Sequence, residues 1–448
     1  MEAPAIAPTA PRTFFDMTGY QWAVLAAAWL GWGFDSFDAL IFNWVAPNCV
    51  PTLLGLPIGS AAAKAATLQW TGILTSLLLV GWAVGGILFG QIADRLGRSR
   101  TLLLTMLMYS VGTALCALAP NLWMLVLFRA IASLGIGGEW AAGAAMVAEV
   151  MPERRRIEAG ALLYTAAPLG IFLAAAVNLQ IAGVWMKNSP ETSWRYVFLA
   201  GLLPAAVAIL VRVFVKEPER WKQAVATTRP PRLRELFDEQ HWRLTRSGLA
   251  MAFVALITWW SCNAFLPVKT AYLAQSTAQA QGLSPEDTRQ LIEHWKSTAT
   301  KYFNWGGLIG TLLTVPIAKR FGRRSMFAVY FLLSGAAILA THGLDLSPPV
   351  RLSMEFLIGL TVFGVFGSFT YYLPELFPTR LRATGAGFTY NTGRILAAVG
   401  PLAVGAVAAR GAVLKALFFV GFVPLAGLLF LPWVIETRGT ALRDDIAH

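Results

Sequence analysis

The sequence is poor in charge and in the residues that carry most enzyme chemistry. Only 13% of its 448 residues are charged and 56% are hydrophobic, whereas a typical soluble domain has roughly 25% charged residues. A soluble chain of this length would need far more polar surface to cover its core. The composition therefore excludes an ordinary soluble domain and indicates a protein surrounded by lipid.

Cysteine and histidine are scarce, and their placement excludes several kinds of site. The three cysteines are Cys49, Cys116 and Cys262, and the four histidines are His241, His294, His342 and His448. The cysteines have neither metal-ligand spacing nor the pattern of a disulfide framework, and no histidine is predicted to lie in mid-membrane. The chain also lacks a phosphate-binding P-loop and a nucleophile–base arrangement. We expect no enzyme activity, no metal and no cofactor.

The net charge of +12 is distributed in short basic clusters between apolar runs. A nucleic-acid-binding protein would instead carry its basic residues along one helix face or in a tail. Seventeen Trp and forty Gly are typical of membrane helices, where Trp lies at the interfaces and Gly permits close packing. We therefore expect the partner surface to be a lipid bilayer and not a nucleic acid.

Long apolar runs recur along the whole chain and predict an all-α membrane protein. A helix needs about 20 mostly apolar residues to cross a bilayer. This length predicts twelve spans, at 20–45, 69–92, 101–119, 122–149, 158–183, 195–215, 247–273, 299–318, 326–343, 351–373, 384–408 and 413–434. The residues before the first span have no basic n-region, so this span is expected to be an uncleaved anchor.

The basic clusters fall on one side of a twelve-span arrangement. With both termini on that side, 23 of the 36 Lys and Arg lie there. Positive residues resist translocation, so the richer side is cytoplasmic. The prediction is a multi-pass inner (plasma) membrane protein with both termini in the cytoplasm.

The chain repeats itself at an offset of about 225 residues. The pattern Glu-x-x-Pro-x-x-x-Arg begins at Glu149 and again at Glu375, and Arg-x-Gly-Arg begins at Arg95 and again at Arg320. The copies fall in equivalent loops, which predicts two pseudo-symmetric six-helix bundles with a transport site between them near the bilayer midplane. The predicted parts are an N-terminal segment 1–19, bundles 20–215 and 247–434, a cytoplasmic linker 216–246 and a tail 435–448. The linker is either a tether on the anionic leaflet or a regulatory element.

The loop between the second and third predicted spans carries Gly90, Asp94, Arg95, Gly97 and Arg98. This spacing resembles the signature loop of the major facilitator superfamily. Gly90 permits close helix approach, Gly97 permits a tight turn, and Asp94 can bind basic groups or a helix N-terminus of the other half. We expect these residues to form part of a cytoplasmic gate; the alternative is that their charges only set the topology.

The two Glu-x-x-Pro loops resemble those of sugar porters and their organic-anion relatives. The resemblance implies ion pairs that form at the cytoplasmic side in the outward-facing state and break in the inward-facing state. The expected gating residues beyond the signature loop are Glu149, Arg156, Arg320, Arg323, Glu375 and Arg382. In the second half Lys319 stands where the first half has Asp94, so Glu375 is the acid available there.

Ionisable residues inside the first and fourth predicted spans indicate proton coupling. A buried Arg such as Arg129 is costly unless it faces a partner or a cavity. Asp35 and Asp38, three residues apart in the first span, share one helical face, and Glu139 follows Arg129 in the fourth span. In sugar porters a first-span acid pairs with an Arg at this position, and the resemblance implies that these four residues handle the transported proton. The alternative is a permanent buried ion pair.

Arg394, in the eleventh predicted span, is the candidate substrate contact. Its equivalent in the first half is Leu169, so the repeat does not impose it, and its planar fork suits a carboxylate ligand. Further candidates for the same site are Asn391, Tyr390, Asn263 and Trp259. The alternatives are snorkelling of Arg394 toward an interface, its pairing with Glu355, and simple packing of the Trp.

The run from Gly135 to Arg156, together with Asp35 and Asp38, most resembles the sialate and lactate branch of proton symporters. The resemblance extends over about residues 20–440 and implies a twelve-helix major facilitator fold that works as a monomer. It also implies proton-coupled uptake of a small organic anion, such as a monocarboxylate, sialic acid or aromatic acid, by alternating access. The alternatives are a sugar or polyol porter, an exporter of amphipathic compounds, and a sensor that does not transport.

Overall fold

The structure, a computed structural model, describes residues 17–443 apart from 228, 398, 401–402 and 405–411. Within these ranges the chain forms helices and no strands. They make twelve helical segments in the predicted order, several of them broken into shorter helices, and the eleventh is described only in part. Eight segments are long and apolar enough to cross a membrane by length and composition. Most of the predicted N-terminal segment, parts of the second half of the eleventh span and the end of the tail lie outside the described residues.

The N-terminal half contains the first six segments. Its helices are α1 (Gly19–Leu54), α2 (Ala61–Leu96), α3 (Arg98–Cys116), α4 (Leu122–Val150), α5 (Arg156–Tyr164), α6 (Ala166–Asn178), η1 (Leu179–Trp185), α7 (Pro190–Leu199), η2 (Ala200–Leu202) and α8 (Leu203–Phe214). Thr18 starts the half with a reciprocal cap, since its hydroxyl accepts from the Gln21 amide and the Gln21 side chain accepts from the Thr18 amide. Such a cap satisfies main-chain donors that the first turn of a helix leaves free.

The linker and the C-terminal half follow. The linker contains α9 (Glu219–Thr227) and η3 (Leu233–Phe237). The second half contains α10 (Glu239–Gln281), α11 (Pro285–Phe321), α12 (Arg323–Gly343), α13 (Pro348–Ser353), α14 (Glu355–Ile358), η4 (Gly359–Phe363), η5 (Gly364–Ser368), α15 (Phe369–Leu376), η6 (Thr379–Leu381), α16 (Arg382–Ala397), α18 (Val413–Val420), α19 (Phe422–Gly427) and η7 (Leu428–Trp433).

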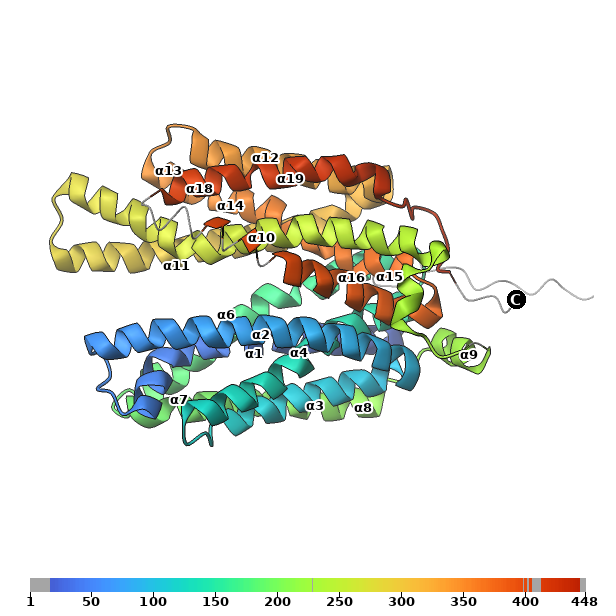
Figure 1. The fold of residues 1–448 in the computed structure, drawn as a ribbon, viewed down its shortest axis with the longest axis horizontal. Helices are drawn as coiled ribbons and strands as arrows, with labels where there is room; N and C mark the ends of the chain where they lie inside the picture. Colours follow the sequence, from blue (N-terminus) through green and yellow to red (C-terminus); the bar gives the residue numbers. More distant parts are fainter. Residues whose placement is uncertain (1–16, 228, 398, 401–402, 405–411, 444–448) are drawn as a thin grey trace, which may run out of the picture.

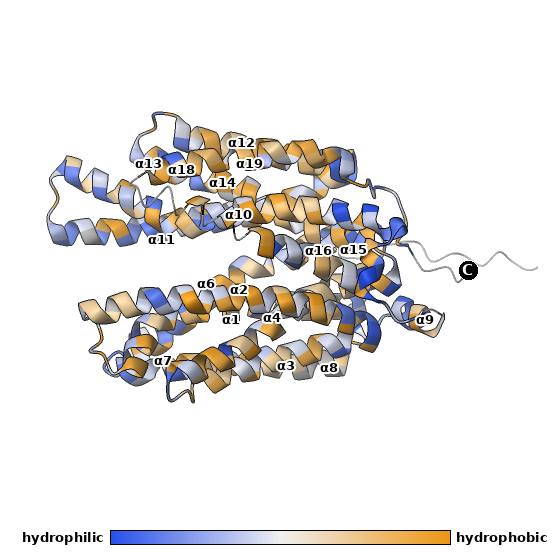
Figure 2. Cartoon of the chain, in the orientation of Figure 1, coloured by the Kyte–Doolittle hydropathy of each residue, from blue (hydrophilic) through white to orange (hydrophobic). Residues whose placement is uncertain are grey.

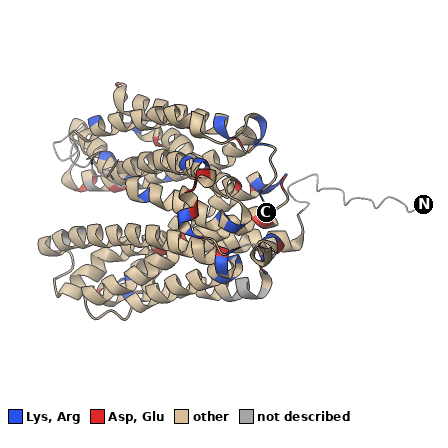
Figure 3. Cartoon of the chain, turned by 45° about the vertical axis from the view of Figure 1, so that its right-hand side comes forward, with Lys and Arg blue, Asp and Glu red and all other residues tan. Residues whose placement is uncertain are grey.

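The two halves lie side by side along their length, the first below the second in Figure 1. The connections α2–α3, α4–α5 and α15–α16 lie at one end with the linker and the described part of the tail, and α1 also starts there, because Gln21 donates to the Val150 carbonyl at the end of α4. Lys and Arg gather at this end (Figure 3), which we call the basic end. Between the ends, apolar residues dominate the helices (Figure 2).

Two equivalent turns at the basic end depend on glycine. Gly97 has φ +116 between α2 and α3, and Gly322 has φ +90 between α11 and α12. Residues with a Cβ rarely adopt these φ values. The repeat found in the sequence therefore reflects the same tight connection built twice.

The seventh and eighth segments are longer than the sequence predicted. The predicted spans 247–273 and 299–318 leave residues 274–298 as a connection, yet α10 continues to Gln281 and α11 begins at Pro285 with Ser284 as its cap. The two helices form a hairpin that projects past the other connections at the end opposite the basic end (Figure 1). A prediction from apolar runs underestimates the length of such helices because their outer turns are polar, as Figure 2 shows.

The tenth segment is irregular in its middle. After α14 the chain forms a π-helix, η4, and then a 3-10 helix, η5, before α15 resumes. Departures of this kind from α-helical geometry inside a helix are frequent at functional sites. Phe363 and Phe366, which line the cavity described below, belong to these two turns.

Candidate transport site

A cavity lies between the two halves. It is bordered by α1, α2, α5 and α6 of the first half and by α10, η4, η5 and α16 of the second. Its walls are mainly aromatic, with rings from Trp32, Trp82, Tyr164, Trp259, Trp260, Phe363, Phe366 and Tyr390. Such a cavity favours a flat, apolar ligand body.

Arg394 is the one charged side chain among the described residues that line the cavity. Its Nη1 donates to Asn391 Oδ1 at 2.7 Å, and its guanidinium lies 4.1 Å from the centre of the Trp82 ring and 5.0 Å from that of Tyr390. Within the described part of the chain it forms no ion pair, and its Nε has no hydrogen-bond partner. The guanidinium is therefore held in place while its charge remains available to a ligand.

The alternatives considered for Arg394 do not match its surroundings. The side chain is 6% exposed and faces the cavity, so it does not snorkel to an interface. Glu355 is bound elsewhere, by Lys269 at 2.5 Å.

Asn391 occupies the closest approach of α16 to α2. It donates to the Gly387 carbonyl at 2.8 Å, and a Cβ at Gly86 would overlap its amide. Tyr390 and Trp259 also line the cavity, as the sequence predicted for a shared site. Asn263, placed with them by sequence, is half-buried on α10 and is not among the residues that line the cavity.

Asp38 and Arg129 form a buried ion pair inside the first half. Arg129 Nη1 lies 2.9 Å from Asp38 Oδ1 and Nη2 donates to the Asp38 main-chain oxygen at 3.1 Å. Thr113 donates to the same carboxylate oxygen at 2.5 Å. The sequence predicted this pairing of a first-span acid with a fourth-span Arg. Most hydrogen-bonding groups of the two side chains have a partner.

Asp35 and Glu139 form a second acidic site with much less support. Both Asp35 oxygens are buried without a partner among the described residues, and Glu139 accepts only a long hydrogen bond, 3.5 Å, from Thr105. A Cβ at Gly31, one turn before Asp35, would overlap the Glu139 carboxylate, so the two acids belong to one pocket. Uncompensated charge is expensive inside a membrane, and these two carboxyl groups have far fewer hydrogen-bond partners than Asp38.

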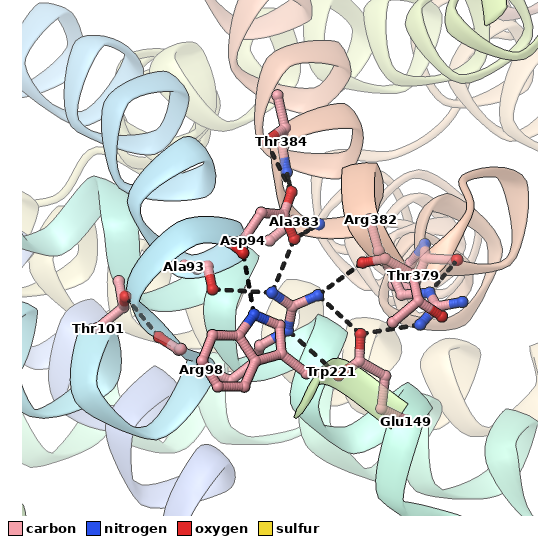
Figure 4. A network of polar contacts seen from close by, with 12 residues as sticks. Ala93, Asp94, Arg98, Thr101, Glu149, Trp221, Thr379, Arg382, Ala383 and Thr384 are labelled. Carbon is pink, nitrogen blue, oxygen red and sulfur yellow. Dashed lines mark hydrogen bonds and ion pairs between the residues drawn. The ribbon is translucent and has the colours of Figure 1, made fainter. Parts of the chain in front are cut away.

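At the basic end Asp94 joins the two halves. Its carboxylate accepts from the amides of Ala383 and Thr384, at 3.2 and 2.7 Å, and from the Thr384 hydroxyl at 2.6 Å. These groups lie at the N-terminus of α16, where a negative charge is stabilising. Arg98, 2.8 Å from Asp94, extends the network to the Thr379 carbonyl of the second half (Figure 4).

Two glutamates each bind one Arg from each half. Glu149 pairs with Arg98 and Arg382, both at 2.8 Å (Figure 4). Glu375 pairs with Arg323 at 2.7 Å and with Arg156 at 3.9 Å. The two clusters are related by the sequence repeat, and together they close the basic end of the molecule.

Two predicted gating residues lie outside these clusters. Arg95 donates to the Pro231 carbonyl of the linker at 2.9 Å. Arg320 is exposed and stacks over the neighbouring Phe321 ring. Lys319, which replaces the acid of the signature loop, forms its own contact between the halves with Glu158 of α5 at 2.5 Å.

Sequence reasoning gave no structural role to Glu217 and Glu436, which cap equivalent helices. The Glu217 carboxylate accepts from the amides of Ser99 and Arg100 at the start of α3. The Glu436 carboxylate accepts from the amides of Arg323 and Arg324 at the start of α12. The signal was present in the sequence, because each Glu follows the last helix of its half.

The linker contacts both halves. Besides the Arg95 contact, Glu235 pairs with Arg380 of the second half at 2.6 Å. Partial burial alone would raise the pKa of Glu235, but hydrogen bonds from Arg380 and from the Arg232 amide outweigh it and lower the pKa below its ordinary value. The contact is therefore fully formed at neutral pH and is lost only as the pH falls through that lowered pKa.

A buried cluster in the second half was missed. Lys269 of α10 pairs with Glu355 of α14 and lies 3.4 Å from His342 Nε2 of α12, and all three side chains are buried. His342 Nδ1 lies 2.9 Å from the Ile338 carbonyl, which favours the tautomer with the proton on Nδ1. The signal that could have identified the cluster was a lysine within the predicted span 247–273.

The Lys269–Glu355 pair gives a first prediction. Lys269→Met or Glu355→Gln alone is expected to lower the free energy of unfolding by about 3–5 kcal/mol, because each leaves an unpaired buried charge. The double variant is expected to lose less than the sum. Thermal unfolding in detergent tests this as a double-mutant cycle, with the exposed Lys296–Glu293 pair as control. Additive losses at the buried pair would contradict it.

Two repeated six-segment halves, a cavity between them and ion pairs that join them at one end are features of a membrane transporter. The chain belongs to the major facilitator superfamily, whose sequence profile matches residues 13–401. Members of this family are transporters, so the protein is a transporter and not an enzyme.

Comparison with individual proteins agrees. The chain is 29% identical over 425 residues to a probable 4-methylmuconolactone transporter of Cupriavidus pinatubonensis, covering 93% of this chain and 91% of that one. It is 27% identical over 382 residues to the sialic acid transporter NanX of Escherichia coli, covering 83% and 84%. The proton:xylose symporter XylE has the same fold, with a TM-score of 0.72 at 18% identity over 94% of this chain and 98% of that one.

Proposed function

We propose that the protein imports a small organic anion together with a proton. The observation that carries the proposal is Arg394, a cation in an aromatic cavity that has no acidic partner among the described residues. A bidentate carboxylate is the ligand that best satisfies a fixed guanidinium. The names of the relatives, a lactone transporter and a sialic acid transporter, support an oxygen-rich organic substrate.

Within this class the cavity favours a planar, unsaturated or aromatic carboxylate. Eight rings line it, and beside Arg394 its polar groups are few. Sialic acid carries many hydroxyl groups that would be left without partners in such a site. A sugar or polyol porter is less well supported for the same reason: no Gln or Asn is among the described lining residues, and the Asn391 amide is already used by Gly387 and Arg394.

For the proton, we assign different roles to the four residues of the first half. Asp35 and Glu139 share a pocket in which neither carboxyl group forms an ion pair among the described residues, and they are the carriers. Asp38 and Arg129 are tied to each other and to Thr113, and they hold α1 against α4 and α3. Proton binding at Asp35 or Glu139 removes a buried negative charge and so changes which conformation is favoured.

The basic end corresponds to the cytoplasmic side in this proposal, with both termini inside the cell and one chain as the transporting unit. Its network closes that side, so the conformation faces outward. Release of substrate to the cytoplasm requires the contacts of Asp94, Glu149 and Glu375 across the halves to break.

This gate gives a second prediction. A Cβ at Gly90 would overlap the Ala383 carbonyl across the interface, so Gly90→Val is expected to hold the basic end open and lower uptake at least about tenfold. Gly72→Val is the control, because Gly72 lies in the same helix with open space beside it. A cysteine placed at the buried Ala141 should react faster with a cytoplasmic thiol reagent in Gly90→Val. Equal uptake in both glycine variants would refute the gate.

The test of the function itself is transport by the purified protein in proteoliposomes. A panel of aromatic, aliphatic and sugar acids and neutral sugars is offered under an imposed pH gradient, and uptake and internal pH are followed together. We expect uptake of planar carboxylates with acidification of the lumen when the exterior is acidic. Uptake of neutral sugars alone would mean that the protein is a sugar porter. Uptake of a carboxylate without proton movement would mean that transport is not coupled to protons.

A further inference from the structure

Trp140 connects the proton pocket with the substrate cavity. It follows Glu139 directly on α4, and its indole ring stacks on Tyr390 of α16 with 4.4 Å between ring centres and 17° between planes. Among the described residues this is the closest pair of rings, and it joins the two halves. Trp140 is 3% exposed and its indole Nε1 has no hydrogen-bond partner in the described part of the chain.

The stack has an ionisable group at each side. On the first half, Glu139 is bound only by the long contact from Thr105 and shares its pocket with Asp35. On the second half, the Tyr390 ring lies 5.0 Å below the guanidinium of Arg394. One connection between the carboxyl group that can bind a proton and the cation that can bind the substrate therefore passes through this pair of rings.

Glu139 is surrounded by groups that cannot balance its charge. From α1 it faces Gly31 and Asp35, and from α3 it faces Thr105 and Tyr109. None of these is a cation that could neutralise it. Trp140 is the next residue of α4, so a rearrangement around Glu139 that moves this turn of the helix would also move Trp140.

We propose that Trp140 is a positioning residue that transmits the protonation state of Glu139 to Arg394. The inference rests on the proposed function. A shift of the Trp140 ring displaces Tyr390, and since Tyr390 and Trp82 contact the same guanidinium, the donor groups of Arg394 are reoriented in the cavity. Trp140 belongs to the first half and Tyr390 to the second, so the stack requires the present arrangement of the two halves. Both properties make carboxylate affinity depend on the proton, which is what coupling requires.

The tests compare Trp140→Leu and Trp140→Met, which lack a ring, with Trp140→Phe, which keeps one. Trp185→Leu, at a side chain 71% exposed, is the matched control. Each protein is assayed in proteoliposomes for counterflow of a planar carboxylate without a pH gradient, for accumulation under a gradient, and for protons moved per substrate. Thermal unfolding identifies variants that do not fold.

We expect the two ring-less variants to keep counterflow within about threefold of wild type and to lose accumulation by about tenfold, the effect of roughly 1.4 kcal/mol of coupling. Trp140→Phe should restore accumulation, and Trp185→Leu should resemble wild type. A ring-less variant that accumulates substrate normally, or that loses counterflow and accumulation in equal measure while folded, overturns the inference. If the wild type itself moves no protons, the proposed function fails instead, and the two failures are distinguished by that measurement.

Discussion

Arg394→Ala is expected to lower the transport efficiency for a carboxylate substrate by about 30-fold or more. A hydrogen-bonded charge pair that loses one partner in a desolvated site costs about 2–5 kcal/mol, and each 1.4 kcal/mol is about tenfold in binding. Arg394 is the single charged residue among the described lining residues, so no neighbour can take over its role. Initial rates of uptake over a range of substrate concentrations measure the loss.

Arg394→Lys separates charge from geometry. Lys supplies a cation but neither the planar fork nor the same stacking on Trp82 and Tyr390, so we expect a partial recovery well below wild type. Arg320→Ala is the control, because Arg320 is exposed and outside the ion-pair clusters. Uptake by Arg394→Ala at the wild-type rate would mean that the substrate is recognised elsewhere or carries no negative charge.

Asp35→Asn and Glu139→Gln are expected to uncouple the transporter. Each removes a carboxyl group that can bind a proton while keeping nearly the same shape, so exchange of substrate across the membrane continues and accumulation does not. For one proton per monovalent anion, a gradient of one pH unit supports about tenfold accumulation, and in the variants the ratio should fall to about one. Accumulation of labelled substrate and the internal pH are measured in the same vesicles.

Asp38→Asn is the informative comparison for this prediction. It leaves Arg129 buried without its acid, so we expect a less stable protein with reduced exchange as well as reduced accumulation. If Asp38→Asn alone abolished accumulation while Asp35→Asn and Glu139→Gln were coupled normally, the roles assigned to the two acidic sites would be reversed.

The sequence predicted some contacts of the candidate site and not others. The pairing of Arg129 with a first-span acid was implied by the resemblance to sugar porters. The association of Arg394, Asn391 and Tyr390 follows from helical spacing, because residues three or four apart share a face. Asn263 was placed in the site on the same reasoning, yet it is not among the residues that line the cavity. Spacing gives the faces of one helix but not which face its neighbours cover.

The division between Asp35 and Asp38 could not be read from the sequence. The two lie on one helical face and are chemically identical. What separates them is that Thr113 and Arg129, 75 and 91 residues away, reach Asp38, whereas Asp35 faces Glu139. The Lys269–Glu355 pair was missed for a related reason, since its members are far apart in the chain and each taken alone resembles an ordinary residue near the end of a span.

The sequence by itself determined the membrane setting, the order of the twelve segments and the two-fold repeat. Those properties depend on hydropathy and on short motifs. Both can be recognised in segments of about 20 residues without knowledge of tertiary contacts. The tertiary structure decided which carboxylates are paired, that Trp140 meets Tyr390 across the interface, and that Arg394 faces a cavity without an acid. These facts depend on contacts between distant segments, and a buried charge or ring acquires its role only from the groups that packing brings to it.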